Sequence, residues 1–162
     1  MDKLMEYQAA FCLEDVQRNV LLPFTLPQDY EQLAVRLHYG PKEVRDPEII
    51  RPRIEECVRK YFPPGVTLTE KDMEEYPCLL NFVTLSLDCG EEYVGCAHRH
   101  PPDQTILVSE REASPGFFRR RAGKGPWRVV LHVQAVVAGT VDCHVAVFGL
   151  KGGERVDEIP AV

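Results

Sequence analysis

The sequence lacks the long apolar segments that carry a protein into or across a membrane. No apolar run in its 162 residues approaches the ~20 residues that a membrane helix needs. Near the start, Glu6, Gln8, Glu14 and Asp15 interrupt the apolar residues, so no signal peptide is predicted. We therefore expect a cytoplasmic protein that has no membrane partner.

An excess of basic charge is also missing. The 19 Lys and Arg residues are outnumbered by 25 Asp and Glu residues, and the net charge of −6 disfavours binding to nucleic acid. A hydrophobic fraction of 44% is typical of a globular chain, and the length suits one domain. We expect residues 1–150 to form that domain and the polar residues 151–162 to form a loosely held tail.

Motifs of nucleophilic enzymes and nucleotide-binding loops are absent as well. The sequence has no Gly-x-Ser-x-Gly elbow and no Gly-x4-Gly-Lys-Ser/Thr loop. Cys143 and His144 are neighbours whose side chains point to opposite faces of a regular strand, so they cannot act as a pair. These absences predict that the chain is not an enzyme.

The six cysteines are scattered, and without an export signal we expect them to be reduced. Cys57 and Cys143 lie at apolar positions of a helix and a strand, which predicts that both are small core residues.

What the sequence does contain is the alternating pattern of β-strands. Hydrophobic and polar residues alternate across residues 33–39, and proline at positions 23 and 27 favours an edge for the strand that begins at Asn19. Other strands are expected at residues 7–13, 79–87, 105–109, 127–137 and 141–148. The pattern predicts a mainly β protein with an antiparallel, jelly-roll-like β-sandwich.

The last two strands predict a hairpin. Apolar residues occupy the odd positions of both strands, so a three-residue loop at 138–140 would place both sets on one face. His132, Gln134, Asp142 and His144 would then share the opposite face. A surface ligand set of His132, Asp142 and His144 is one interpretation, but outward polar alternation is sufficient to account for them.

A helical insertion is predicted at about residues 46–76. Asp46 and Pro47 form a helix start, and apolar residues recur at helical spacing until Tyr61. A second, shorter helix is expected to begin at Thr69 and to end before Pro77. The apolar stripe of the first helix is expected to cover the open face of the sandwich; the alternative is a self-association surface.

The stretch Ala-Ser-Pro-Gly-Phe at 113–117, followed by Gly-Pro-Trp at 125–127, carries a family resemblance. It resembles the N-terminal β-sandwich domain of carbaryl-hydrolase-like metallohydrolases of the PHP phosphoesterase superfamily, over roughly residues 5–40 and 78–149. Residues 41–77 have no counterpart there. The His-x-Asp-x-His strand of the family's catalytic domain is missing. The resemblance therefore implies an accessory domain that stands alone.

The densest group of potential metal ligands is Cys96, His98 and His100, with Cys89 upstream. Zinc binds Cys and His tetrahedrally, but structural zinc sites normally need two such knuckles, and here there is one. A polar turn is favoured over a zinc site, so we expect no cofactor.

A basic loop interrupts this acidic protein at Arg119, Arg120, Arg121 and Lys124. Arginine binds phosphate and carboxylate bidentately, and the neighbouring glycines let the backbone approach an anion. With the adjacent 96–100 turn, this loop is the most plausible contact surface.

We therefore expect a non-catalytic β-sandwich module that binds a protein, an anionic group or a carbohydrate. The alternatives are a small metal-binding protein or metalloenzyme that uses Cys96, His98 and His100, and a structural domain that self-associates as a homodimer.

Overall fold

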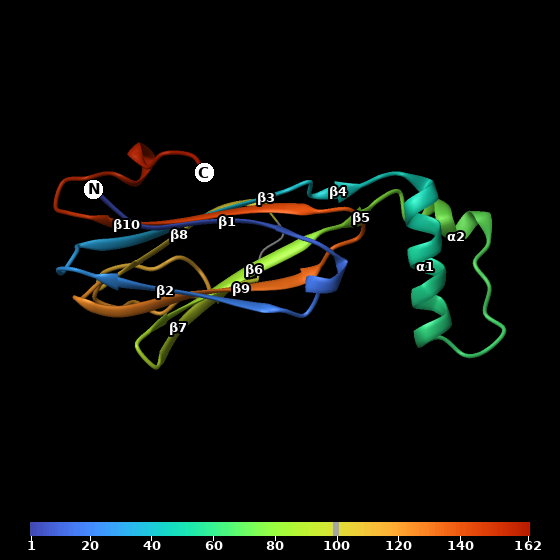
Figure 1. The fold of residues 1–162 in the computed structure, drawn as a ribbon, viewed down its shortest axis with the longest axis horizontal. Coiled ribbons are helices and arrows are strands. Elements are labelled where there is room, and N and C mark those ends of the chain that lie inside the picture. Colours follow the sequence, from blue (N-terminus) through green and yellow to red (C-terminus); the bar gives the residue numbers. More distant parts are fainter. Residues whose placement is uncertain (99–100) are drawn as a thin grey trace.

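Two four-stranded antiparallel sheets pack face to face in the computed structural model, which describes residues 1–98 and 101–162 (Figure 1). Sheet A consists, in spatial order, of β1 (Asp2–Phe11), β10 (Val141–Leu150), β3 (Gln32–Gly40) and β8 (Asp103–Ser109). Sheet B consists of β2 (Asn19–Leu26), β9 (Gly125–Ala135), β6 (Phe82–Cys89) and β7 (Glu92–Ala97). The predicted mainly β, antiparallel sandwich with a helical insertion is confirmed.

One core fills the space between the sheets. Alternate side chains of every strand of sheets A and B point into it, among them Val35, Leu85, Leu131 and Val145, all at most 1% exposed. Trp127 is buried there too, and its indole Nε1 donates a hydrogen bond to the Gly123 carbonyl at 3.1 Å.

Cys143 belongs to this core, as predicted. Burial raises the pKa of its thiol to about 12. All six cysteines of the chain are free thiols.

The predicted hairpin between the last two long strands is wrong. β9 lies in sheet B and β10 lies in sheet A, so the 138–140 loop carries the chain from one sheet to the other. The apolar residues at odd positions of β9 and of β10 do face the same core, but the two strands contribute them from opposite sheets. Alternation shows which side of a strand is buried and does not show which strand is its neighbour. The edge position of β2, which Pro23 favoured, is confirmed.

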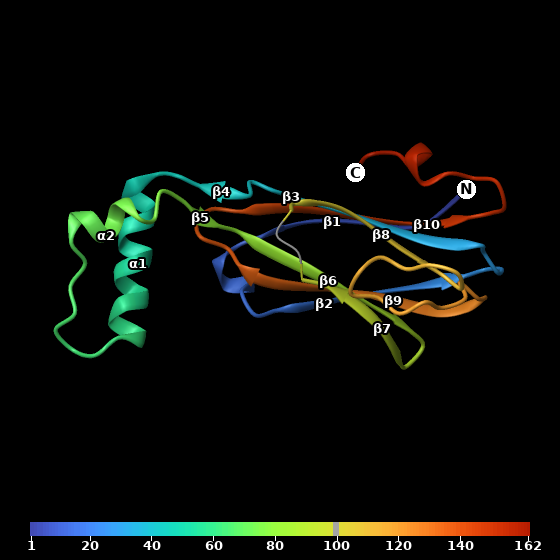
Figure 2. The same ribbon diagram turned by 180° about the vertical axis from the view of Figure 1, so that it is seen from behind.

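The helical insertion projects from one end of the sandwich instead of covering a sheet (Figures 1 and 2). A short ribbon of β4 (Glu43–Val44) and β5 (Leu79–Leu80) leads to α1 (Pro47–Tyr61) and α2 (Glu70–Glu74). Asp46 caps α1 by accepting a hydrogen bond from the Glu48 amide, and Thr69 and Asp72 cap α2, as predicted.

The expectation that the apolar stripe of α1 covers the open face of the sandwich is therefore wrong. In α1 only Ile50 and Ile54 are buried, and Tyr61 is 71% exposed. Cys57 is also exposed and is not the core residue that the helical spacing suggested. Within residues 1–98 and 101–162, the helices are too short and too polar to cross a bilayer.

The C-terminal segment lies against the outer face of sheet A. Ile159, which follows the short 3-10 helix η2 (Val156–Glu158), is buried against Ala34, Ala146 and Phe148. The guanidinium of Arg36 donates a hydrogen bond to the Ile159 carbonyl at 3.0 Å. The segment for which we expected a loosely held tail thus has an anchor at Ile159.

Asn81 joins the base of the insertion to the sandwich. Its side chain is fully buried, its Oδ1 accepts a hydrogen bond from the Val137 amide at 2.7 Å, and its Nδ2 donates one to the Pro41 carbonyl at 2.9 Å. One side chain therefore holds three segments that are distant in sequence.

Replacing Asn81 with Ala should lower the free energy of unfolding by about 1–3 kcal/mol for each backbone group left without a partner. Urea denaturation measures this change. The control is Gln134→Ala at an exposed position of β9, which should change stability by less than about 0.5 kcal/mol. Equal stabilities of the two variants would contradict the role assigned to Asn81.

Candidate functional site

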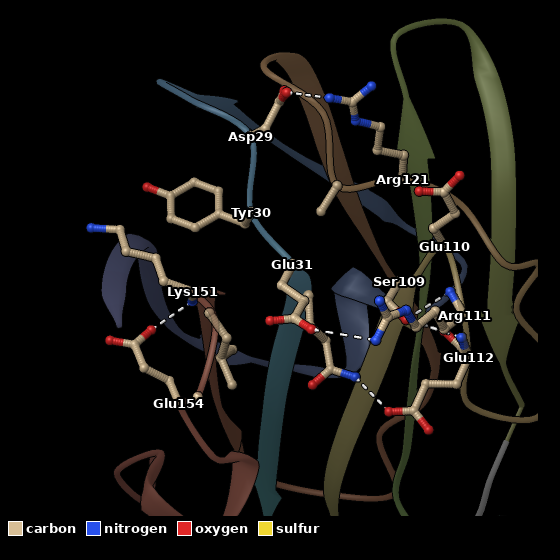
Figure 3. A pocket seen from close by; sticks show the side chains of 14 residues that line it. Asp29, Tyr30, Glu31, Ser109, Glu110, Arg111, Glu112, Arg121, Lys151 and Glu154 are labelled. Carbon is tan, nitrogen blue, oxygen red and sulfur yellow. Dashed lines mark hydrogen bonds and ion pairs between the residues drawn. The ribbon is translucent and has the colours of Figure 1, made fainter.

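A hollow of about 750 Å³ opens at the end of the sandwich where β3 begins and β10 ends, which is opposite the helices in Figure 1. Figure 3 shows its lining side chains. We call it the end hollow. Four segments line it: residues 29–32, residues 109–112, residues 121–122, and residues 150, 151, 153 and 154. They meet because β3 begins, and β8 and β10 end, at this end of sheet A. Its volume lies within the range of about 300–1,000 Å³ that is usual for ligand pockets.

The wall of the end hollow carries charges of both signs. Five carboxylates and three cations line it: Asp29, Glu31, Glu110, Glu112 and Glu154, with Arg111, Arg121 and Lys151. Arg121 contacts Asp29 at 2.5 Å, and Arg111 lies 3.9 Å from Glu31. The Gln32 amide donates to Glu112 at 3.0 Å. Ligand hydroxyl groups would meet both donors and acceptors here.

Asp29 organises one rim of the end hollow. Its Oδ1 accepts a hydrogen bond from the Lys124 backbone amide at 2.8 Å, and its Oδ2 accepts one from Arg121 at 2.5 Å. These contacts hold the pKa of the Asp29 carboxyl below its ordinary value, the Lys124 amide first and the Arg121 charge after it. The carboxylate thus fastens the basic loop to the turn between β2 and β3.

The rim is also supported by Tyr30, next along the chain. Its ring fills the space beside Gly149, where a Cβ would lie 2.6 Å from the ring, and its hydroxyl donates to Asp2 at 2.8 Å. The ring is buried, so it braces the wall and offers no stacking surface to a ligand.

The basic loop does not form one cationic cluster. Arg121 lines the end hollow, whereas Arg120 forms an ion pair with Glu92 of β7. Arg119 is exposed, and Lys124 meets Asp29 through its backbone amide. Two of the three arginines are therefore paired with carboxylates, and sequence adjacency was a poor guide to their positions.

The alternative metal-ligand group of Cys96, His98 and His100 is only partly described. Cys96 lies in β7 opposite Ser86, His98 is exposed just after that strand, and His100 lies outside the described residues. Burial raises the pKa of the Cys96 thiol, which disfavours the thiolate that zinc requires. Within the described part of the chain, no three His, Cys, Asp or Glu side chains are arranged to hold a metal ion.

The histidines of the two long strands do not share a face, because their strands belong to different sheets. His144 lies on the outer face of sheet A, 2.9 Å from Glu6. His132 lies on the outer face of sheet B between Ser86, at 3.0 Å, and Asn19, at 2.8 Å. The surface ligand set of His132, Asp142 and His144 is therefore excluded.

Sequence reasoning missed the contacts of His132 and most of the end hollow. Ser86 and Asn19 read as ordinary outward polar positions, and no motif marks them. The lining of the end hollow comes from four separate turns, of which only the basic loop carried a signal in the sequence.

No known protein family, no curated protein and no solved structure matches the chain. The resemblance to the accessory domain of the PHP metallohydrolases stays a prediction. The chemistry of the sites is thus argued from their geometry.

Titration of Asp29 tests the architecture of the rim. Because its pKa is lowered in the folded protein, the stability that Asp29 contributes is present above its ordinary pKa of 3.8 and is lost as the pH falls below that value. Replacing Arg121 with Ala should raise the pKa of Asp29, although the Lys124 amide keeps it below 3.8. Carbon-13 NMR of the carboxyl measures both values. An unchanged pKa in the variant would show that Arg121 does not contact Asp29 in solution.

Proposed function

We propose that this chain is a non-catalytic binding module and that its ligand occupies the end hollow. The observation that supports this is a concave site walled by ionised donors and acceptors. Loops at the end of a rigid sandwich are a common place for binding residues, because the sheets hold the loops in position.

The mixture of charges favours a neutral polyhydroxyl ligand of the saccharide class. Each hydroxyl group can donate to a carboxylate and accept from a guanidinium, and hydrogen bonds to ionised partners are the stronger ones. An anionic ligand fits less well, since the five carboxylates of the lining outnumber its three cations. Of the two ligand classes expected from the sequence, an anionic group and a carbohydrate, we therefore favour the carbohydrate.

Titration with a saccharide panel, followed by amide NMR, tests this function. Neutral mono- and disaccharides should shift amides at residues 29–32 and 109–112, and acidic saccharides should shift them less. The double variant Glu31→Gln and Glu112→Gln removes two charged acceptors and should weaken binding at least about tenfold. Glu91→Gln, on the exposed turn between β6 and β7, is the matched control.

Two results would contradict the proposal. One is an absence of shifts at millimolar saccharide. The other is tighter binding of acidic than of neutral saccharides, which would favour the anionic ligand. Shifts confined to residues outside the end hollow would count against the site itself.

The projecting helices support a second candidate function, self-association through a second copy of the chain. Tyr61, Phe62, Val66 and Tyr76 are each at least 46% exposed. Glu48 lies in the first turn of α1, and Arg59 and Lys60 lie in the last. Two antiparallel copies of α1 would therefore place opposite charges beside each other.

Sedimentation velocity tests this candidate. The chain should sediment as a dimer, and both the double variant Tyr61→Ser, Phe62→Ser and a chain lacking residues 46–76 should sediment as monomers. Tyr93→Ser, at a 56% exposed position of β7, is the control that should remain dimeric. A monomeric unmodified chain would exclude self-association, and a shortened chain that is still dimeric would show that the helices are not the interface.

A further inference from the structure

A second hollow, of about 500 Å³, lies between α1 and the end of the sandwich from which the helices project (Figure 1). We call it the helix hollow. One wall is the C-terminal half of α1. The other wall comes from the 3-10 helix η1 (Leu13–Asp15), from β5 and from the chain where β9 ends. The volume lies within the range of about 300–1,000 Å³ that is usual for ligand pockets.

Hydrogen bonds at Val137 fix the position of α1 beside the sandwich. The Arg53 Nε of α1 donates to the Val137 carbonyl at 3.0 Å, and the Val137 amide donates to Asn81 at 2.7 Å. The backbone of Val137 thereby connects the helix with the base of the insertion. The helix hollow is therefore a built part of the fold.

Apolar and aromatic side chains line the helix hollow and are open to solvent. Leu13 is 45% exposed, Leu80 is 38% exposed and Tyr61 is 71% exposed. The remaining apolar lining consists of Leu79, Ala135 and Val137. Large apolar side chains that gather around an open concave surface mark a binding site. A hydrocarbon chain placed here would remove this surface from water.

The rim of the helix hollow carries an excess positive charge. Arg53, Glu56 and Lys60 line it, and Glu56 forms its ion pair with Arg53 at 3.3 Å. The Lys60 ammonium lies 5.1 Å from the centre of the Tyr61 ring, and within residues 1–98 and 101–162 no carboxylate forms an ion pair with it. One cation therefore remains available to an acidic group of a ligand, at the edge of an apolar surface.

We infer that the helix hollow binds an aliphatic monocarboxylate. Its hydrocarbon chain lies against Leu13, Leu80 and Ala135, and its carboxylate meets the Lys60 ammonium. A saccharide fits poorly here, because its hydroxyl groups would lie unpaired against the apolar wall. A small inorganic anion would reach Lys60 and leave the apolar wall exposed.

This site goes beyond the proposed binding function and lies at the other end of the sandwich. The helix hollow and the end hollow have no lining residue in common. Loss of saccharide binding would leave the helix hollow intact, and a failure to bind carboxylates would leave the end hollow untouched. Tyr61 and Lys60 also belong to the proposed self-association surface, so each measurement below is paired with sedimentation velocity.

Protection of a thiol tests the site directly. Cys57 lines the helix hollow as an exposed free thiol, and iodoacetamide alkylates it with release of iodide. Sodium octanoate should slow this alkylation in a saturable way, as followed by peptide mapping and mass spectrometry. Cys89 and Cys96 lie outside the hollow, and their rates should not change. Hexanoate and butyrate should bind progressively more weakly, by about fourfold for each methylene removed.

Variants of Lys60 test recognition of the carboxylate. Lys60→Gln should weaken octanoate binding about tenfold or more and leave 1-octanol binding unchanged, because only the contact with the charged head is lost. Lys60→Arg should restore the affinity. Arg59→Gln is the matched control, since it removes the same charge from the neighbouring exposed position outside the hollow. Each variant is compared with and without octanoate, because a nearby charge changes the intrinsic reactivity of Cys57.

Four results would overturn the inference. They are an unprotected Cys57 at millimolar octanoate, equal affinity for octanoate and 1-octanol, equal loss of octanoate affinity in Arg59→Gln and Lys60→Gln, and protection that occurs only when the chain associates. Both substituted positions are exposed on α1, so the variants should fold, and thermal melts verify this.

Discussion

The packing of two sheets against one shared layer of side chains determines the other features of this molecule. Every strand of both sheets contributes inward residues to the single core, and the buried apolar area is the dominant favourable term in folding. Each strand therefore has a fixed inner face and a fixed outer face. The outer faces become surfaces on which polar side chains of neighbouring strands are held in register, and the strand ends become rigid supports for loops.

The end hollow and the polar side chains on the outer face of sheet B use this framework in different ways. The end hollow is built from turns, and its shape depends on ion pairs such as Arg121 with Asp29 that hold the turns together. The hydrogen-bonded group of Ser86, His132 and Asn19 is built from strands, so the sheet itself sets the spacing of the three side chains. Side chains placed by a β-ladder are constrained more tightly than side chains placed by loops.

Helices and strands were predicted from the sequence more accurately than the order of the strands in the sheets. Asp46 and Pro47 marked the start of α1 correctly, and alternation identified the buried faces of β3, β9 and β10. It could not assign β9 and β10 to different sheets, because both arrangements bury the same odd-numbered residues. For the same reason Ser86, His132 and Asn19 could not be grouped from sequence, since their contacts depend on the order of the strands. The arginines of the basic loop were visible, but their carboxylate partners come from distant turns.

The two ends of the sandwich differ in chemistry and are separated by the full length of its strands. β3 runs from Gln32 at the end hollow to Gly40, just before the ribbon that carries the helices, and β10 returns over the same distance. A molecule bound at one end therefore does not obstruct the other. The proposed saccharide site and the proposed self-association surface therefore do not compete for the same part of the molecule.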